Sequence, residues 1–357
     1  MRELAVVVGT RPEIIKMAPV VRAATDRFDL HLVHTGQHYD DEMSGAFFAS
    51  LDLPAPDENL SIGSGTQAEQ TADGLVGVES MLTEREPAAV LALGDTNAVL
   101  STAIAASKLP TAFGHIEAGL RSFDRTMPEE VNRVVADHVA EFSFAPTEQA
   151  VEHLADEGVT AGVYETGNTI VDACREHVPL AEERSDVLEE LGLPEPYVAA
   201  TIHRPHNTDD PERLRAIMGA LDGAGAPVVL PAHPRTQSVL DDLGYEPTGS
   251  LELVGPLDYL DFLKLLDNAT VAVTDSGGIQ EEASILEVPC LTVRPNTERP
   301  ETVDAGVNQL VEPGELRGRV ETLLEDDAAR AAMTGHPDLY GDGRAGERIV
   351  DVLDEHC

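Results

Sequence analysis

The chain alternates short apolar runs, bounded by Gly, Pro or Asp, with segments long enough to form a helix. This alternation is typical of strands that pair in parallel, because each parallel connection needs a crossover that is usually a helix. We count six runs in each half of the chain: 4–9, 30–36, 88–95, 111–117, 141–147 and 163–168, then 197–203, 227–233, 251–257, 271–277, 289–294 and 308–314. The pattern predicts an α/β protein with two Rossmann-like, doubly wound sheets.

The length of 357 residues favours two domains, because a single hydrophobic core usually stops growing below that size. We expect an N-terminal domain over residues 1–170 and a C-terminal domain over residues 171–340, with a charged helical linker near 169–195. The segment 341–357 predicts an amphipathic helix that packs back on the N-terminal domain. If the two domains face each other, the cleft between them is the expected binding site.

Targeting and redox features predict a cytoplasmic protein. The first apolar run is too short for a membrane span or a signal peptide, and no later stretch is long and apolar enough to cross a bilayer. Three scattered cysteines (Cys174, Cys290 and Cys357) predict neither a disulfide framework nor a paired metal motif.

The charge balance excludes several classes of partner. There are 65 acidic and 24 basic residues, and the formal net charge is −41. Such a surface argues against binding to nucleic acid or to an anionic membrane. The acids crowd into helices and loops while the apolar runs stay intact, so we interpret the surface as halophilic, with salt screening the repulsion. The alternative is an ordinary acidic cytosolic protein.

Two glycine turns precede predicted helices and predict anion binding. In the first, Gly9 begins the turn, Arg11 follows it and Lys16 lies one helical turn later; Arg11 paired with a neighbouring carboxylate is the alternative. The second turn offers the stronger pattern. Ser276 can cap a helix, Gly277 and Gly278 let a diphosphate approach the backbone, and Glu282 can accept from ribose hydroxyls.

Three acids follow strands or begin helices in the first half. Asp95 ends the third run, where helix capping is the simple explanation. His115 and Glu117 lie on one face of an extended segment. Glu129 completes a capping box with Thr126, which alone accounts for it. Together, however, three carboxylates near one pocket provide acids and bases for proton transfer.

In the second half, His203 ends the first strand and is placed to meet these carboxylates. A metal site of His203, His206, Asp209 and Asp210 is a rival, but Pro205 disfavours a regular helical pair and no tetrahedral spacing is present. Arg299 is available to a phosphate, although a surface pair with a glutamate explains it almost as well.

The motifs together resemble the non-hydrolysing UDP-N-acetylglucosamine 2-epimerases. The matching segments, in order, are GTRPEIIKMAPV, TGQHYD, LGDTNA, HIEAGLRSFDRTMPEEVNR, TIHRPHN, TDSGGIQEEA, NTERPET and GDGRAGERI. The resemblance implies a GT-B-type architecture, with UDP bound mainly by the C-terminal domain, and a homodimer. It also implies interconversion of UDP-N-acetylglucosamine and UDP-N-acetylmannosamine without a redox cofactor or an essential metal. The family's route is anti elimination of UDP to 2-acetamidoglucal, followed by re-addition.

The resemblance also assigns roles to residues. By matching motifs, the catalytic residues are Asp95, Glu117, Glu129 and His203. The nucleotide-binding positions are Arg11, Lys16, Ser276, Gly277, Gly278, Glu282 and Arg299. The segment TGQHYDDEM departs from members that are activated by their own substrate, which leaves such activation open.

Three rival functions remain at this stage. An epimerase of the same family could act on a related substrate such as a UDP-2,3-diacetamido-2,3-dideoxy-glucuronic acid. A glycosyltransferase of this fold would not need the clustered acids, and a silent sugar-nucleotide sensor could lack them. The three carboxylates therefore favour catalysis.

Overall fold

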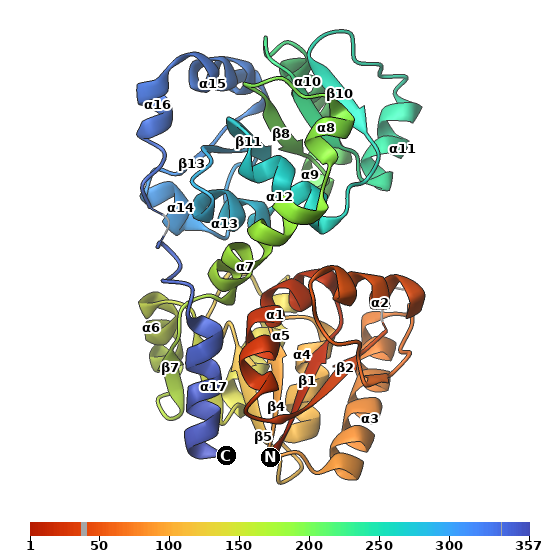
Figure 1. The fold of residues 1–357 in the computed structure, drawn as a ribbon, viewed down its shortest axis with the longest axis vertical. Coiled ribbons are helices and arrows are strands. Elements are labelled where there is room, and N and C mark those ends of the chain that lie inside the picture. Colours follow the sequence, from red (N-terminus) through yellow and green to blue (C-terminus); the bar gives the residue numbers. More distant parts are fainter. Residues whose placement is uncertain (37–40, 337) are drawn as a thin grey trace. The chain divides into compact units, whose positions relative to one another are not determined.

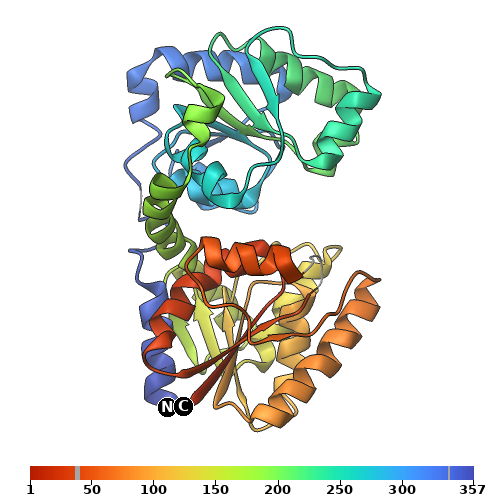
Figure 2. The ribbon, with the colours of Figure 1, turned by 45° about the vertical axis from the view of Figure 1, so that its right-hand side comes forward.

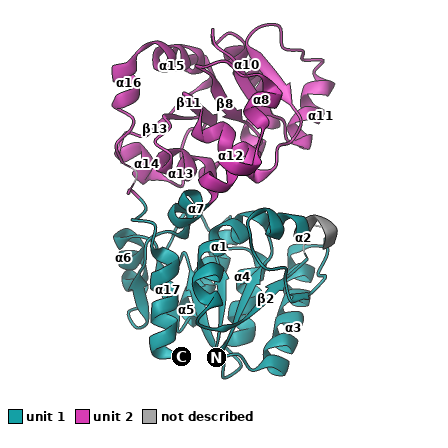
Figure 3. Cartoon of the chain, viewed as in Figure 1, with its two compact units in different colours: residues 1–176, 340–357 teal, residues 177–339 magenta. Residues whose placement is uncertain are grey.

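A computed structural model describes residues 1–36, 41–336 and 338–357. The chain forms two compact units, one of residues 1–176 and 340–357 and the other of residues 177–339 (Figure 3). Each unit contains one parallel sheet with helices around it (Figure 1). The predicted α/β class with two parallel sheets is confirmed.

The first unit has seven strands in the order β3-β2-β1-β4-β5-β6-β7. Their bounds are β1 Glu3–Val8, β2 Asp29–His34, β3 Glu58–Asn59, β4 Ala89–Leu93, β5 Ala112–Ile116, β6 Phe142–Ala145 and β7 Val163–Glu165. All six predicted runs of the first half form strands. The edge strand β3 was not predicted, because its two polar residues have no apolar pattern.

Among the described residues, seven helices surround the sheet of the first unit. Along the chain they are α1 Arg11–Thr25, α2 Asp41–Ser50, α3 Gln67–Arg85, α4 Asn97–Ala106, α5 Pro128–Val139, α6 Glu148–Asp156 and α17 Ala345–His356. Helix α4 packs between α3 and α5, and α17 packs on α1. The predicted C-terminal helix is therefore present as α17.

Packing in the core explains why the strand sequences are continuously apolar. Ala5 and Val7 of β1 pack with Val90 and Ala92 of β4 against Val78 and Met81 of α3. The alternate residues Leu4 and Val6 are also fully buried, since helices cover both faces. Parallel sheets covered on both faces need such runs.

The second unit has six strands in the order β10-β9-β8-β11-β12-β13. Their bounds are β8 Val198–Thr201, β9 Val228–Pro231, β10 Leu251–Val254, β11 Val271–Thr274, β12 Cys290–Thr292 and β13 Asn308–Leu310. The helices are α8 Val187–Leu191, α9 Pro205–Thr208, α10 Pro211–Asp222, α11 Pro234–Asp242, α12 Tyr259–Asp267, α13 Gly277–Ile285, α14 Pro300–Asp304, α15 Pro313–Glu325 and α16 Asp327–Ala331. All six predicted runs of the second half form strands. Helix α7 (Thr169–Arg184) contains the boundary between the units and is helical as predicted.

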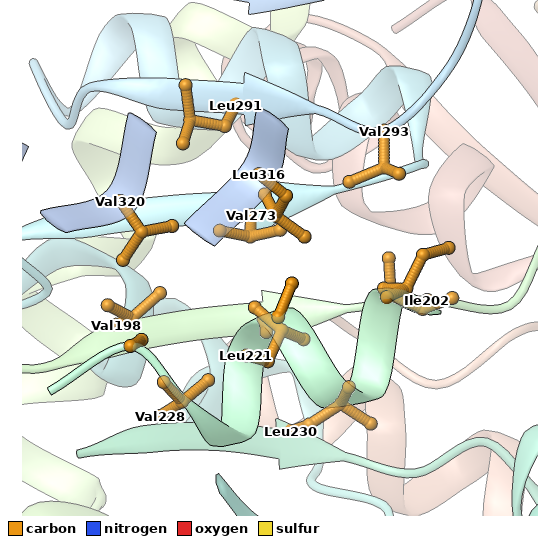
Figure 4. Packing of buried hydrophobic residues seen from close by; sticks show 14 of the residues in the cluster. Val198, Ile202, Leu221, Val228, Leu230, Val273, Leu291, Val293, Leu316 and Val320 are labelled. Atoms are coloured by element: carbon orange, nitrogen blue, oxygen red, sulfur yellow. The ribbon is translucent and has the colours of Figure 1, made fainter. Parts of the chain in front are cut away.

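One core fills the space between this sheet and helices α10 and α15. Val198, Val228, Val273 and Leu291 from four strands meet Leu221 of α10, and Leu316 and Val320 of α15 close the cluster (Figure 4). In both sheets the strand order reverses beside the first strand, between β1 and β4 and between β8 and β11. Ligands of open α/β sheets bind at the carboxyl ends of strands at this switch point.

None of the helices in the described part of the chain is both long and apolar enough to cross a membrane.

Helix α17 lies beside α1 in both views (Figures 1 and 2). The contact is close at Gly346, where a Cβ atom would lie 2.9 Å from the carbonyl carbon of Pro19. Pro19 is buried within α1, and the Gly346 N–H donates to Asp172 at 2.9 Å. Only glycine lets the two backbones approach this closely.

Replacing Gly346 by alanine is expected to lower the free energy of unfolding by about 1–3 kcal/mol, because the added methyl must push α17 away from α1. Gly318 is the matched control, since it is exposed inside α15 and a Cβ there meets nothing within 4 Å. Gly318→Ala should instead stabilise by up to about 1 kcal/mol through helix propensity. Urea unfolding of both variants measures the difference, and equal effects would contradict the close contact.

Candidate active site

Asp95 lies directly after β4 but does not cap the following helix. Thr96 holds the N-cap position of α4, and its side chain accepts from the Ala98 N–H at 3.2 Å. The Asp95 carboxylate instead pairs with the guanidinium of Arg133 on α5. Its backbone carbonyl accepts from Asn132 at 2.8 Å. Helix capping therefore does not account for this aspartate.

Glu117 lies directly after β5, the neighbour of β4, in a left-handed backbone conformation with φ of 69°. Such a conformation is strained for a residue with a side chain and is common at functional sites. Its carboxylate accepts from the Lys16 ammonium at 2.6 Å, and both side chains are nearly buried. One carboxylate oxygen lies 3.6 Å from the place of a Cβ on Gly94, the residue before Asp95. The ends of β4 and β5 thus bring Glu117 next to the turn that carries Asp95.

Glu129 lies in the first turn of α5, which begins at Pro128. The predicted capping box with Thr126 is wrong, because Met127 holds the N-cap position and the Thr126 hydroxyl donates to Asp124 at 2.6 Å. Glu129 is half-exposed and has no hydrogen bond or ion pair within the described residues. It precedes Arg133 by four residues on the helix, so the two share a face. Arg133 itself pairs with Asp95, so Glu129 lies one helical turn before a partner of Asp95.

The adjacent Glu130 has a structural role that the sequence did not reveal. Its carboxylate accepts from the Ser122 N–H, the Ser122 hydroxyl and the Phe123 N–H, each at 2.9 Å. Burial alone would raise the pKa of Glu130, but these hydrogen bonds and the charge of Arg133 lower it below its ordinary value. The bonds hold Phe123, whose φ of 58° is strained, in the loop before α5.

The first glycine turn binds an anion of the protein itself. The Glu13 carboxylate accepts from the Gly9 N–H at 2.6 Å and the Thr10 N–H at 2.7 Å, and from the Thr96 hydroxyl at 2.5 Å. Burial raises the pKa of Glu13 although these hydrogen bonds oppose it. The expectation that these amides face an external anion is wrong, since Glu13 fills the turn. The Arg11 guanidinium lies over the Phe47 ring, 5.3 Å from its centre.

The second glycine turn differs in that its helix start is not capped. Ser276 holds the N-cap position of α13, but its side chain makes no capping bond, so the predicted capping by its hydroxyl is wrong. In the part of the chain that the structure describes, no group accepts from the N–H of Gly277, Gly278 or Ile279. A Cβ on Gly278 would meet nothing closer than 4.0 Å, and on Gly277 nothing closer than 3.9 Å. Neither glycine is therefore required by packing within the protein.

Acidic and basic groups surround this helix start. Glu282 is buried in α13, and its neighbour Glu281 accepts from Arg299 at 2.5 Å. Arg299 thus pairs with a glutamate, but the pair is not the predicted surface pair, because Glu281 is buried and only about a fifth of the Arg299 side chain is exposed. Burial would raise the pKa of Glu298, but the bidentate bond and charge of Arg294 lower it to about 2.

Asp275, which immediately precedes the helix start, organises the loop of His203. This fully buried carboxylate accepts from the backbone N–H of His203 and Arg204 and from the Asn207 amide at 2.9–3.1 Å. The His203 ring nitrogen Nδ1 lies 3.3 Å from the same carboxylate. Burial lowers the pKa of His203 and outweighs the opposing charge of Asp275. The sequence motif contained Asp275, but its role depends on the loop after β8, which no local pattern reveals.

The acids of the rival metal site have other partners. Asp210 caps α10 by accepting from the N–H groups of Glu212 and Arg213, and Asp209 pairs with Arg235 at 2.5 Å. Over residues 1–36, 41–336 and 338–357, no group of three or more His, Cys, Asp or Glu side chains is arranged to hold a metal ion. Tyr39 and Asp40, where the departure from the substrate-activated members begins, lie outside the described residues.

The structure therefore gathers the predicted residues into two sets. At the carboxyl edge of the first sheet lie Asp95, Glu117, Glu129 and Lys16, with Arg11 at the start of α1. At the carboxyl edge of the second sheet lie His203, Ser276, Gly277, Gly278, Glu282 and Arg299. The first set offers carboxylates for proton transfer, and the second offers free N–H groups at a helix start for an anion.

Comparison with known proteins gives consistent matches over the chain. Residues 22–354 match the family model described as UDP-N-acetylglucosamine 2-epimerase. A UDP-N-acetylglucosamine 2-epimerase of Methanocaldococcus jannaschii is 42% identical, over 98% of each chain. The solved structure of the Methanocaldococcus jannaschii enzyme in complex with UDP-GlcNAc and UDP aligns with a TM-score of 0.86 over 99% of each chain, at 42% identity. A UDP-2,3-diacetamido-2,3-dideoxy-D-glucuronate 2-epimerase of Pseudomonas aeruginosa is 38% identical, over 98% of this chain and 99% of its own.

Replacing Glu130 by glutamine is expected to lower the free energy of unfolding by about 2–3 kcal/mol, because charge-assisted bonds to the Ser122–Phe123 loop are lost. The lowered folded-state pKa of Glu130 means that its stabilisation exists above the unfolded pKa and is lost as the pH falls through the folded pKa. The difference between variant and wild type should therefore shrink in acid.

Glu129→Gln is the matched control for this measurement, since Glu129 makes no bond in the described structure and should change stability by less than about 0.5 kcal/mol. Denaturant unfolding at several pH values tests both. Equal losses of stability in the two variants would rule out a stabilising role for the Glu130 bonds to the Ser122–Phe123 loop.

Proposed function

The chain belongs to the UDP-N-acetylglucosamine 2-epimerase family, and we propose that it interconverts UDP-N-acetylglucosamine and UDP-N-acetylmannosamine. The observation that carries the proposal is the meeting of Glu117 with the Gly94–Asp95 turn at the ends of β4 and β5, in a chain similar throughout to such epimerases. The rival substrate, a diacetamido uronic acid, is that of a relative with lower identity.

The reaction that fits these residues is elimination of UDP followed by its return. A base removes the proton from carbon 2, the electrons of that C–H bond form a double bond to carbon 1, and UDP leaves with the electrons of the C–O bond. In the return step, UDP oxygen bonds to carbon 1 and an acid delivers a proton to the opposite face of carbon 2. One base and one acid are therefore needed, and we assign the work to Asp95, Glu117 and Glu129, with His203 as a further catalytic group.

The departing diphosphate gains negative charge, which the start of α13 is suited to bind. Its uncapped N–H groups point out of the first turn, and the open space beside Gly277 and Gly278 admits a phosphate next to the backbone. We assign Ser276, Gly277 and Gly278 to the diphosphate, and Glu282 to the ribose hydroxyls. Arg299 contributes charge if it turns from Glu281. Contact of Arg11 and Lys16 with the nucleotide stays a prediction, since their charges face Phe47 and Glu117.

Incubation of the protein with UDP-N-acetylglucosamine in deuterated water and strong salt is expected to yield the 2-epimer with deuterium at carbon 2. Asp95→Asn, Glu117→Gln and Glu129→Gln should each lower turnover by about 100-fold or more, because each removes a group of the proton transfer. Mass spectrometry and proton NMR measure label and product. Near-normal rates in all three variants, or release of free N-acetylmannosamine, would refute the assignment.

We further propose a halophilic, cytoplasmic homodimer that binds neither nucleic acid nor membranes. The net charge of −41 supports both the salt requirement and the absence of polyanionic partners. An apolar groove of about 500 Å³ on the first unit supports the dimer; its lining includes Leu75 of α3 and Val131 of α5. Val131 remains 40% exposed and the nearby Val76 64% exposed.

Removal of salt is expected to lower the melting temperature and to dissociate the dimer, because unscreened acids repel within and between copies. Sedimentation and thermal unfolding over a range of KCl concentrations measure both effects. Sucrose is the control, since it favours compact states without screening charge. Full stability and an unchanged mass in dilute buffer would contradict the proposal.

A further inference from the structure

A fully buried histidine lies beneath the predicted carboxylates of the first unit. His115, in β5, is stacked on Phe113 and has no exposed surface. Its Nδ1 lies 2.6 Å from the Asp137 carboxylate of α5, and its Nε2 lies 2.7 Å from the Gly94 carbonyl oxygen. Both ring nitrogens thus make short hydrogen bonds.

The chemistry of the two partners determines the charge of this ring. A carbonyl oxygen accepts hydrogen bonds and never donates, so Nε2 must carry a proton. An ionised carboxylate also only accepts, so Nδ1 must carry a proton as well. The other oxygen of Asp137 accepts from Arg121 at 2.7 Å and from the Gly119 N–H at 3.1 Å, which favours the ionised form. The ring is then an imidazolium rather than a neutral imidazole.

The surrounding charges support this assignment. Burial by itself lowers the pKa of His115, but the charge and hydrogen bond of Asp137 raise it above its ordinary value of 6.5. Burial raises the pKa of Asp137, and the His115 and Arg121 charges more than compensate, so that it lies below the ordinary value. Glu157 balances Arg121 at 2.7 Å, and the four charges sum to zero. A buried network with every member paired avoids the penalty of an isolated charge.

The same bonds hold the two turns that present the catalytic acids. The Gly94 carbonyl belongs to a left-handed turn, with φ of 86°, directly before Asp95. Asp137 holds the N–H of Gly119, which has φ of 80° and closes the turn after Glu117. The His115–Asp137 pair therefore bonds two backbone groups, the Gly94 carbonyl just before Asp95 and the Gly119 N–H just after Glu117.

We propose that His115 is a permanently charged positioning residue, which fixes the turns that carry Asp95 and Glu117. It is not a catalytic residue, because both of its nitrogens are used within the protein. The inference rests on the proposed function for the roles of Asp95 and Glu117. Lys16 beside Glu117 and Arg133 beside Asp95 are the other cations that face these acids.

Ring ¹⁵N NMR of the full chain tests the charge without reference to activity. His115, assigned by comparison with His115→Gln, is expected to show two ring protons at pH values where a free histidine is already neutral. A neutral ring under these conditions would overturn the proposal, and this measurement needs no variant of Asp137 to fold.

Asp137→Asn tests the consequence for the reaction, since the amide keeps an acceptor for the ring but removes the negative charge. We expect the ring of His115 to become neutral and kcat to fall by about tenfold or more with little change in KM, because the two turns lose the charge-assisted bond that holds them. An unchanged kcat together with a lower melting temperature would leave Asp137 and His115 with a structural role alone.

His138→Asn is the matched control, because His138 adjoins Asp137 on α5 but is exposed, and its ring contacts the Val134 carbonyl oxygen rather than the His115–Asp137 pair. It should leave the charge of the His115 ring and kcat unchanged. Failure of the wild type to epimerise UDP-N-acetylglucosamine would refute the proposed function and the positioning role in this reaction, whereas the NMR result decides the charge of His115 separately.

Discussion

Burial of parallel strands on both faces is the constraint from which the rest of this structure follows. Strands such as β1 and β4 have no surface on which a polar side chain meets water, so their sequences are apolar along the whole length. Polar side chains then lie mainly where a strand ends, and His115 within β5 is buried with a hydrogen-bond partner for each ring nitrogen. Asp95, Glu117, His203 and Asp275 each lie at or within two residues after such an end, and pairing of neighbouring strands brings residues distant in sequence together.

The two glycine turns share a local motif but differ in what their backbone N–H groups bind. Both connect the first or switch-point strand of a sheet to a helix, and both present backbone N–H groups. In the first unit Glu13 folds back and fills the turn, which turns a possible anion site into a rigid joint between β1 and the Thr96 cap of α4. In the second unit no described group accepts from the N–H groups at the start of α13, and a Cβ on either glycine would meet nothing closer than 3.9 Å. One internal hydrogen-bonded carboxylate thus separates the structural turn of the first unit from the proposed phosphate site of the second.

Much of the fold was predictable from the sequence, because apolar periodicity depends only on neighbours along the chain. The strands were found at all six runs in each half, whereas β3 was missed because Glu58 and Asn59 carry no such signal. The capping box at Thr126 failed for a related reason: Pro128 begins the helix two residues later, and Asp124 competes for the hydroxyl. Glu130, Asp137 and Asp275 could not be identified in advance, since each acts on a loop that approaches it only in the folded chain. Their charge was visible in the sequence, but their partners were not.

The strongly acidic surface changes how anions can be held. With three lysines and a net charge of −41, the protein repels a diphosphate at long range, and dissolved salt screens that field. Cations near the proposed carboxylates are already committed, Lys16 to Glu117 and Arg133 to Asp95. Backbone N–H groups carry no net charge, so they do not change the net charge of the protein. They act only at hydrogen-bonding distance, where bulk salt screens little. A helix start is therefore the kind of phosphate ligand that an acidic protein in strong salt can keep effective, while its scarce cations serve to hold carboxylates in place.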